Sequence, residues 1–527
     1  MIQNSPHPEV DIPEVPLTAL LHERARQFPD KPALIDGPSG RSYTYRQLET
    51  LSQRAAAGLA RHGFSQGDVL AIYSPNLPEY AIAFHAVALA GGINTTISPL
   101  YTVDELTFQL RDSGARYLLT VGPFLEKALA AARAVGISRI FVFGEAGEAG
   151  EAAGVIPWAA LLAEGGPAPE PVIAPRQDLL ALPYSSGTTG LPKGVMLTHY
   201  NLVANVLQNA GSPLAPGMDD TIIAVLPFFH IYGLVVVMNL GLYQGATIVT
   251  MPRFELDSFL ETIARYGVTY ANLVPPIVLA LAKHPAVDRH DLSKLRTIFS
   301  GAAPLGGELA EACASRLGCL VFQGYGLTET SPVTHVSPVD PAQAKPGSVG
   351  FPIANTECRI VDLESGEPLG RGQRGEICVR GPQTMLGYLN RPEATAAMIN
   401  EEGWLHTGDI GFIDEDGHLY IVDRLKELIK YKGVQVAPAE LEALLLTHPA
   451  IADAAVIPSP DEEAGEIPKA FVVLRGEATA DEILAFMAER VAPHKRIRLL
   501  DFVDQIPKTA SGKILRRVLI ERERENR

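Results

Sequence analysis

The chain has 527 residues, which is too long for one hydrophobic core and predicts two or more domains. Its composition, 47% hydrophobic and 20% charged, is ordinary for a soluble globular protein. The formal net charge of −16 argues against a general nucleic-acid binder, so an anionic ligand needs a local cluster of positive charge and N–H donors. Four cysteines lack C-x-x-C spacing and are interpreted as reduced core residues of a cytoplasmic protein: Cys313, Cys319, Cys358 and Cys378.

The early chain alternates predicted helices and strands. Thr44 and Gln47 have the capping-box spacing and predict a helix that ends near Gly63. Residues 69–73 are typical of a buried strand, and Asn76 is predicted to cap the next helix. This rhythm predicts an α/β fold with a largely parallel sheet between helices.

Two further stretches bear on whether the chain has a mobile connection and a membrane-spanning segment. Residues 144–171 are rich in Gly, Ala, Glu and Pro and predict an exposed, mobile connection. Residues 221–251 contain no Asp, Glu, Lys or Arg, but Pro227, His230, Gln244 and several glycines divide the span. We therefore predict a buried strand, loop and helix there, and no transmembrane segment.

The pattern changes in the last third of the chain. Residues 350–420 contain short apolar runs separated by Gly, Pro and Asp turns, which predicts a small antiparallel β subdomain. A basic segment with Lys426, Lys430 and Lys432 follows Asp423. The remaining roughly 100 residues read as a compact α+β unit, which is typical of a separate domain.

The most informative stretch runs from Tyr184 to Val195 and contains Ser, Thr and Gly residues with Lys193 near its end. Glycines let backbone N–H groups turn inward, hydroxyls add short donors, and a lysine adds a mobile charge, which suits a polyphosphate. It is not the common nucleotide loop, because no Ser or Thr follows the lysine. The same composition also suits a solvated surface loop.

Four other clusters contain groups suited to chemistry. They are a histidine among aromatic residues at 226–233, a small-residue turn at 300–305, an aromatic–hydroxyl–carboxylate run at 324–329, and residues 404–409, which end in an acid. Taken singly, His230 also fits a satisfied core histidine, and Glu329 and Asp409 also fit turn or cap acids.

In this order, and with the runs 375–381 and 423–433, these motifs resemble the adenylate-forming superfamily of acyl-CoA synthetases, luciferases and peptide-synthetase adenylation domains. The 4-coumarate–CoA ligase branch looks most similar, and the resemblance covers about residues 17 to 517. It implies a large N-terminal domain (1–422) of two layered α/β subdomains plus a small β subdomain (about 345–422). A hinge (423–427) and a mobile, small α+β C-terminal domain (428–527) would follow.

The resemblance implies an ATP-dependent carboxylic acid–CoA ligase, with ATP and CoA as co-substrates and Mg²⁺ held by Glu329. An acyl-AMP and pyrophosphate form first, and CoA then releases AMP. The residues implied in ATP and AMP binding are Ser185, Ser186, Gly187, Thr188, Thr189, Lys193, Ala302, Gln323, Gly324, Tyr325, Thr328, Asp409 and Arg424.

The resemblance also implies two catalytic arrangements. Lys513 would bridge the substrate carboxylate and the α-phosphate, and His230 would orient the carboxylate. Rotation about Lys426 would then replace Lys513 with Lys430 and Gln435 for thioester formation. The residues implied in CoA binding are Lys432, Gly433 and Arg253, the last standing where the family has a lysine.

The resemblance places the acyl pocket at Tyr232, Val236, Phe299, Ala302, Gly326, Pro332 and Val333. Plant-type relatives carry polar groups where this chain has Val236 and Phe299, and an unpaired buried hydroxyl costs about 1–3 kcal/mol. We therefore expect an apolar acid, either an aryl acid with few hydroxyls or a medium- or long-chain fatty acid. We expect small-molecule partners, weak membrane-surface contact if the substrate is a fatty acid, and a monomer or homodimer. The alternatives are an acyl-AMP ligase that loads a carrier protein, and a non-catalytic nucleotide-binding homologue.

Overall fold

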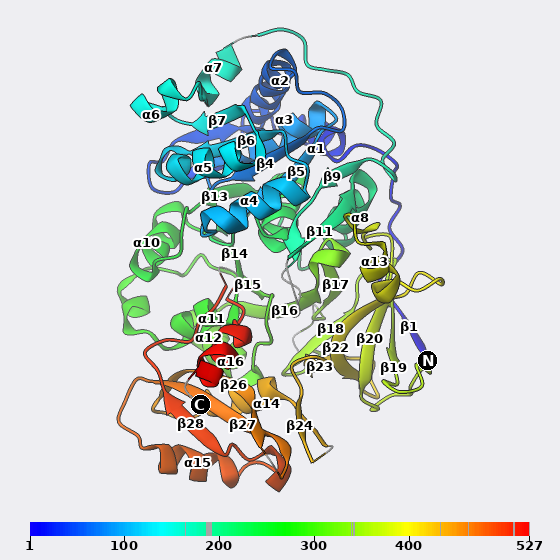
Figure 1. The fold of residues 1–527 in the computed structure, drawn as a ribbon, viewed down its shortest axis with the longest axis vertical. Helices are drawn as coiled ribbons and strands as arrows, with labels where there is room; N and C mark the ends of the chain where they lie inside the picture. Colours follow the sequence, from blue (N-terminus) through cyan, green and yellow to red (C-terminus); the bar gives the residue numbers. More distant parts are fainter. Residues whose placement is uncertain are drawn as a thin grey trace.

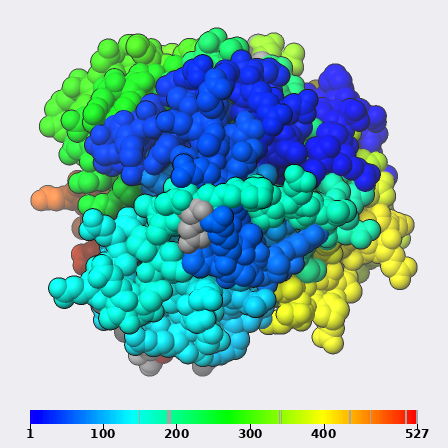
Figure 2. Space-filling model, turned by 90° about the horizontal axis from the view of Figure 1, so that it is seen from above, coloured from blue at the N-terminus to red at the C-terminus, as the bar shows by residue number. Residues whose placement is uncertain are grey.

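The computed structural model describes residues 1–163, 165–185, 192–338, 340, 343–432, 434–461, 463–509 and 512–525. The N-terminal segments form one end of the molecule and the C-terminal segments the other, with a β-rich region beside them (Figure 1). Seen from the N-terminal end, blue and cyan segments cover most of the face (Figure 2). The chain is therefore a large N-terminal α/β domain followed by a small C-terminal domain.

The first sheet belongs to the N-terminal half. Strands β9, β5, β4, β6, β7 and β8 run parallel, and β11 joins β9 in antiparallel pairing. The strands are β4 (Val69–Tyr73), β5 (Ile93–Ile97), β6 (Tyr117–Val121), β7 (Arg139–Phe143), β8 (Ile156–Pro157), β9 (Leu179–Ala181), β10 (Tyr184–Ser185), β11 (Lys193–Thr198) and β21 (Gly387–Tyr388). The predicted buried strand at residues 69–73 is confirmed.

The second sheet joins two regions that the sequence separates. Its order is β1-β19-β20-β22-β23-β18-β17-β16-β15-β14-β12-β13-β2-β3, and the parallel part changes to antiparallel where β16 meets β17. The predicted β subdomain therefore continues the α/β sheet. The strands are β1 (Ile2–Asn4), β2 (Pro32–Asp36), β3 (Ser42–Thr44), β12 (Thr221–Ala224), β13 (Thr247–Thr250), β14 (Tyr270–Leu273), β15 (Thr297–Ser300), β16 (Leu320–Gly326), β17 (Val333–Val336), β18 (Ser348–Pro352), β19 (Glu357–Val361), β20 (Gly375–Arg380), β22 (Leu405–Ile413) and β23 (Leu419–Arg424).

Helices pack on these sheets around an extensive apolar core. They are α1 (Leu17–Ala25), α2 (Tyr45–Arg61), α3 (Pro78–Leu89), α4 (Val103–Asp112), α5 (Leu125–Val135), α8 (His199–Ala210), the π-helix η2 (Tyr232–Asn239), α9 (Leu240–Gln244), α10 (Leu256–Tyr266), α11 (Pro275–Lys283), α12 (Gly307–Leu317), α13 (Pro392–Met398) and the 3₁₀ turns η1 (Gly122–Phe124), η3 (Pro285–Arg289) and η4 (Thr328–Thr330). Residues 221–251 form β12, η2, α9 and β13, as predicted. Within the described ranges, every helix is too short or too polar to cross a bilayer.

The capping prediction is confirmed at one helix and wrong at the next. Thr44 and Gln47 form both bonds of the capping box of α2. Asn76 does not cap α3, whose N-cap is Leu77. Instead, the Asn76 amide donates to the carbonyls of Ala224 and Leu226 and is buried. It therefore joins the two sheets, a tertiary role that outweighs the local capping preference.

The connection predicted at residues 144–171 is partly structured. It contains α6 (Gly147–Ala152), β8 and α7 (Trp158–Ala163). The Trp158 side chain is buried against Phe143, with the ring centroids 5.2 Å apart. Burial of a large aromatic side chain stabilises this segment despite its loop-like composition.

The C-terminal domain is an α+β unit with its own apolar core. Its sheet contains β24 (Ile429–Tyr431), β25 (Val434–Val436), β26 (Ile451–Asp461), β27 (Gly465–Leu474) and β28 (Leu499–Phe502). Its helices are α14 (Pro438–Leu445), α15 (Ala480–Ala488) and α16 (Arg516–Glu525), with the 3₁₀ turn η5 (Pro493–Lys495).

Candidate active site

A cavity of about 800 Å³ lies where the two domains meet. The carboxyl ends of the parallel strands β15 and β16 open into it, which is the usual position of ligand sites in parallel sheets. Residues of the C-terminal domain, Lys508, Thr509 and Lys513, close it from the other side. Most of the predicted nucleotide residues line this one space: Ser185, Lys193, Ala302, Gly324, Tyr325, Thr328, Glu329, Asp409 and Arg424.

The phosphate end of the cavity is built around Glu329. The Ser185 hydroxyl donates to Glu329 Oε1 (2.9 Å), and the Tyr388 hydroxyl donates to the same oxygen (2.7 Å). Lys193 lies 4.8 Å from the centre of the Tyr388 ring. A buried carboxylate that faces a cavity beside a lysine fits a magnesium ion that is also bound to phosphate oxygens.

The predicted phosphate loop has described flanks. Ser185 on β10 pairs with Lys193 on β11 in an antiparallel ladder, so both residues stand at the base of one hairpin. Both Ser185 and Lys193 line the cavity. Ser186, Gly187, Thr188 and Thr189 lie outside the described residues.

The ribose end of the cavity is built around Asp409 on β22. Tyr325 donates its hydroxyl to Asp409 Oδ2 (2.6 Å), and Arg424 Nε lies 3.3 Å from Asp409 Oδ1. Burial raises the pKa of the Asp409 carboxyl, while Arg424 and Tyr325 oppose that rise. The result is a rigidly held acceptor that suits a diol.

A narrow slot between these ends depends on small residues. Ala302 adopts a left-handed backbone conformation (φ 69°), which is uncommon for a residue with a Cβ. A Cβ at Gly324 would lie 2.5 Å from Phe299 Cζ, so a larger residue there would displace the Phe299 ring. Gln323 supports the turn from behind the cavity wall, because its Oε1 accepts the Leu305 N–H (3.0 Å). The small side chains leave the backbone open to a flat ring such as a purine base.

Aromatic side chains continue the cavity beyond the slot. Tyr232 donates its hydroxyl to the Phe299 carbonyl (2.9 Å), and the two rings lie 6.5 Å apart, edge to face. Gly326, Pro332 and Val333 complete this part of the lining. Val236 is buried within η2 and is not among the lining residues that the structure describes.

His230 and Lys513 have strongly altered acid–base properties. Burial, reinforced by the charge of Lys513, lowers the pKa of His230 to about 4, so its imidazole is neutral at pH 7. Burial also lowers the pKa of Lys513 to about 8; Arg424 acts in the same direction, while Glu427 and Asp409 oppose it. A neutral histidine and a lysine near its titration point are suited to charge stabilisation during a reaction.

The residues predicted for the second step lie away from the cavity. Lys430 is exposed on β24, and its backbone pairs with that of Gln435. Lys432 forms an ion pair with Glu463. Arg253 is exposed and outside the described lining. Lys426 does line the cavity, whereas Gly433 is outside the described residues.

Sequence reasoning missed several lining residues. Tyr388 bonds to Glu329, and Lys508 forms an ion pair with Asp453 (2.6 Å) at the cavity wall. Nothing in the local sequence distinguishes Tyr388 from a core tyrosine. Lys508 lies five residues before Lys513 in the same basic segment, which was a usable signal.

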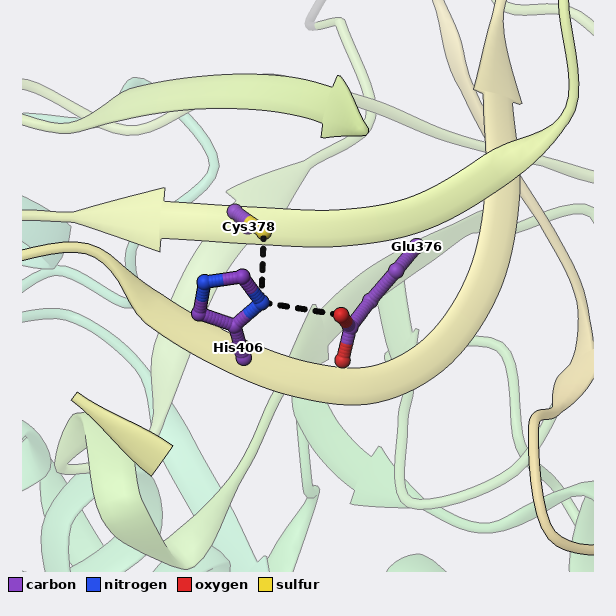
Figure 3. Close-up of side chains that lie close together, drawn as sticks. All are labelled: Glu376, Cys378 and His406. Carbon is purple, nitrogen blue, oxygen red and sulfur yellow. Dashed lines mark hydrogen bonds and ion pairs between the residues drawn. The ribbon is translucent and has the colours of Figure 1, made fainter. Parts of the chain in front are cut away.

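Glu376, Cys378 and His406 form a second polar cluster at the edge of the cavity (Figure 3). Their ligand-type atoms lie within 4.8 Å of one another. His406 Nδ1 is 2.9 Å from Glu376 Oε2 and 3.4 Å from Cys378 Sγ. Burial raises the pKa of the Cys378 thiol to about 12, which keeps it protonated. The cluster is therefore a hydrogen-bonded network.

Comparison with known proteins agrees with this geometry. The model of the AMP-binding enzyme family matches residues 21–389, and that of the AMP-binding enzyme C-terminal domain matches residues 440–513. 4-Coumarate–CoA ligase 1 of Petroselinum crispum is 47% identical over 530 residues, covering 98% of this chain and 96% of that protein. 4-Coumarate–CoA ligase 2 of Oryza sativa subsp. japonica is 46% identical over 531 residues, covering 97% and 93%.

Solved structures show the same architecture. The anthranilate CoA ligase AuaEII, crystallised with anthranoyl-AMP, superposes with a TM-score of 0.90 at 27% identity and covers 98% of each chain. ATP-bound MatB from Rhodopseudomonas palustris superposes with a TM-score of 0.87 at 29% identity and covers 97% of this chain and 100% of its own.

The chain therefore belongs to the AMP-binding enzyme family. It is an enzyme of the AMP-forming acid–thiol ligase class, which couples ATP use to the joining of a carboxylic acid and CoA.

Proposed function

We propose that this ligase activates an aryl acid with few ring hydroxyls, such as a cinnamic-type acid, within the cavity described above. The observation that supports formation of an acyl adenylate is the presence of Lys513, Asp409 and Glu329 in one cavity. An acyl adenylate needs a positive group at the α-phosphate, an acceptor for the ribose and an acid beside the polyphosphate. These three side chains supply one group each.

In the first step, a substrate carboxylate oxygen attacks the α-phosphorus of ATP. The bond from that phosphorus to the bridging oxygen breaks, and pyrophosphate leaves with the electron pair. Lys513 stabilises charge at the α-phosphate, and Lys193 stabilises the leaving pyrophosphate. A magnesium ion held by Glu329 would neutralise phosphate charge when bound.

In the second step, the sulfur of CoA attacks the acyl carbon, AMP leaves, and the thiol proton is released. We propose that the C-terminal domain (428–527) rotates about Lys426, within the hinge 423–427. That movement withdraws Lys513 and brings Lys430, Gln435 and the CoA segment at Lys432 to the cavity. Support comes from the exposed position of Lys430, since it cannot act on the cavity from where it lies.

The aryl preference is supported by the lining of the acyl pocket. Tyr232 and Phe299 present aromatic surfaces, and Val333 adds an apolar one. The two relatives described above are named 4-coumarate–CoA ligases, and this chain matches them over nearly their full length. We expect the apolar side chains to disfavour extra ring hydroxyls, each of which would lose hydrogen bonds at a cost of about 1–3 kcal/mol. The four described cysteines are free and buried, which supports a reducing, cytosolic location.

A pyrophosphate-release assay with ATP and Mg²⁺ tests this proposal. The panel comprises cinnamic, 4-coumaric, caffeic, benzoic, octanoic and palmitic acids. We expect cinnamic acid to give the highest kcat/KM, and AMP to appear once CoA is added. Higher kcat/KM for the fatty acids would contradict the aryl assignment. Thioester formation on a carrier protein but never on CoA, or ATP binding without turnover of any acid, would contradict the ligase assignment.

A further inference from the structure

The turn that presents Asp409 is an irregular part of the β-sheet. Glu376 on β20 pairs with Ile410 on β22, whereas Cys378 pairs with His406. On β20 only Ile377 lies between these two pairs, whereas on β22 residues 407–409 lie between them. Residues 407–409 therefore form a bulge opposite Ile377. Bulges reorient side chains next to active sites, but they leave backbone groups without ladder partners.

Glu376 satisfies one of these backbone groups. Its Oε1 accepts the Gly408 N–H (2.9 Å), and Gly408 has a left-handed φ of 70° immediately before Asp409. The other carboxylate oxygen, Oε2, lies 2.9 Å from His406 Nδ1 (Figure 3). One side chain thus fixes the turn, and His406 in turn holds that side chain.

The carbonyl of the same residue, Gly408, is bound to the proposed hinge. The Leu425 N–H donates to the Gly408 carbonyl (2.9 Å), and Leu425 directly precedes Lys426. Asp409 itself contacts Arg424, the residue before Leu425. Gly408 is therefore bound on one side by Glu376 and on the other by the hinge segment, and Asp409, the proposed ribose acceptor, is the next residue.

We infer that Glu376, oriented by His406, is a positioning residue that holds the Gly408–Asp409 turn in the conformation that binds the nucleotide ribose. This inference rests on the proposed function, because it takes Asp409 as the ribose acceptor. Glu376 acts on the nucleotide through the backbone of Gly408.

Substituting Glu376 separates this role from general stability. Glu376→Ala removes the acceptor for Gly408, so we expect KM for ATP and Kd for AMP to rise roughly tenfold. KM for the acid should stay within about twofold, because the acid lies in another part of the cavity. Glu376→Gln keeps a carbonyl acceptor for Gly408 and loses only one of the two carboxylate oxygens, so its increase should be roughly threefold.

Glu357→Gln is the matched control. Glu357 also lies in this sheet, on β19, and accepts from Arg380 of the neighbouring strand (2.6 Å) away from the cavity. Its AMP affinity should equal that of the unchanged protein. Circular dichroism melting identifies any variant that fails to fold. If Glu376→Ala fails to fold, the AMP affinity of Glu376→Gln decides the test.

AMP titration by calorimetry needs no turnover, so it tests this inference separately from the proposed function. Unchanged AMP affinity in folded Glu376 variants would overturn the inference. An equal loss for ATP and acid would also overturn it, because that pattern indicates general destabilisation. Failure of the unchanged protein to release pyrophosphate with any acid would instead contradict the proposed function.

Discussion

The C-terminal domain carries two lysine segments whose surroundings differ sharply. Lys513 lines the cavity and has a pKa lowered to about 8 by burial. Lys430, on β24 of the same domain, is exposed. The observed arrangement therefore suits the proposed first half-reaction, because the lysine proposed to act at the α-phosphate already lines the cavity.

The Lys513 segment is held in place by contacts on both sides. Gly512 has a left-handed φ of 80°, and a Cβ there would lie 3.3 Å from Val274 Cγ2 at the start of α11. Behind it, Arg516 forms ion pairs with Glu427 (2.6 Å) and Glu442 (2.7 Å). Glu427 lies in the proposed hinge, so the same network would have to rearrange when the domain rotates.

The largest expected effect comes from removing Lys513. Lys513→Ala should lower acid-dependent pyrophosphate release on the order of 10²–10³-fold, because a charge aimed at the α-phosphate is lost. Conversion of supplied acyl-AMP to acyl-CoA should be largely retained. Lys495→Ala, at an exposed ion pair with Glu440, is the control. Equal loss of both half-reactions would refute the distinction between the two lysine segments.

A smaller effect, on the second half-reaction and not the first, is expected from removing Lys430. Lys430→Ala should slow thioester formation from supplied acyl-AMP roughly 10- to 100-fold, the range for a lost charge-assisted hydrogen bond. Pyrophosphate release in a single turnover should remain near the rate of the unchanged enzyme. Lys513→Ala provides the reciprocal comparison. Slower pyrophosphate release in the Lys430 variant would show that this lysine acts in the first step.

The smallest effect is a pH dependence of the first step. In its proposed role at the α-phosphate Lys513 must be protonated, and burial lowers its pKa to about 8. The kcat/KM for pyrophosphate release should therefore fall as pH rises above about 8, approaching tenfold per pH unit. Lys513→Arg should remove this alkaline limb, because a guanidinium stays protonated. A limb that persists in that variant would assign the titration to another group.

The sequence predicted the lining of the cavity less well than it predicted the two lysine segments. Val236 was predicted to line the acyl pocket, but it packs within η2. The unusual winding of a π-helix shifts the face on which a residue lies, and local sequence does not reveal it. Tyr388 was missed for a related reason, because its contact with Glu329 joins residues 59 positions apart.

Local sequence patterns were enough to predict the class of protein and the kinds of groups in its site. Helix caps, buried strands and motifs depend on neighbouring residues, so residues such as Thr44, Lys193 and Asp409 were informative without a structure. Three features became visible only in the folded chain: the β subdomain continues the α/β sheet, Asn76 joins two sheets, and Lys513 rather than Lys430 faces the cavity. These features depend on contacts between distant segments and on how two domains dock, and such contacts leave no periodic signal along the chain.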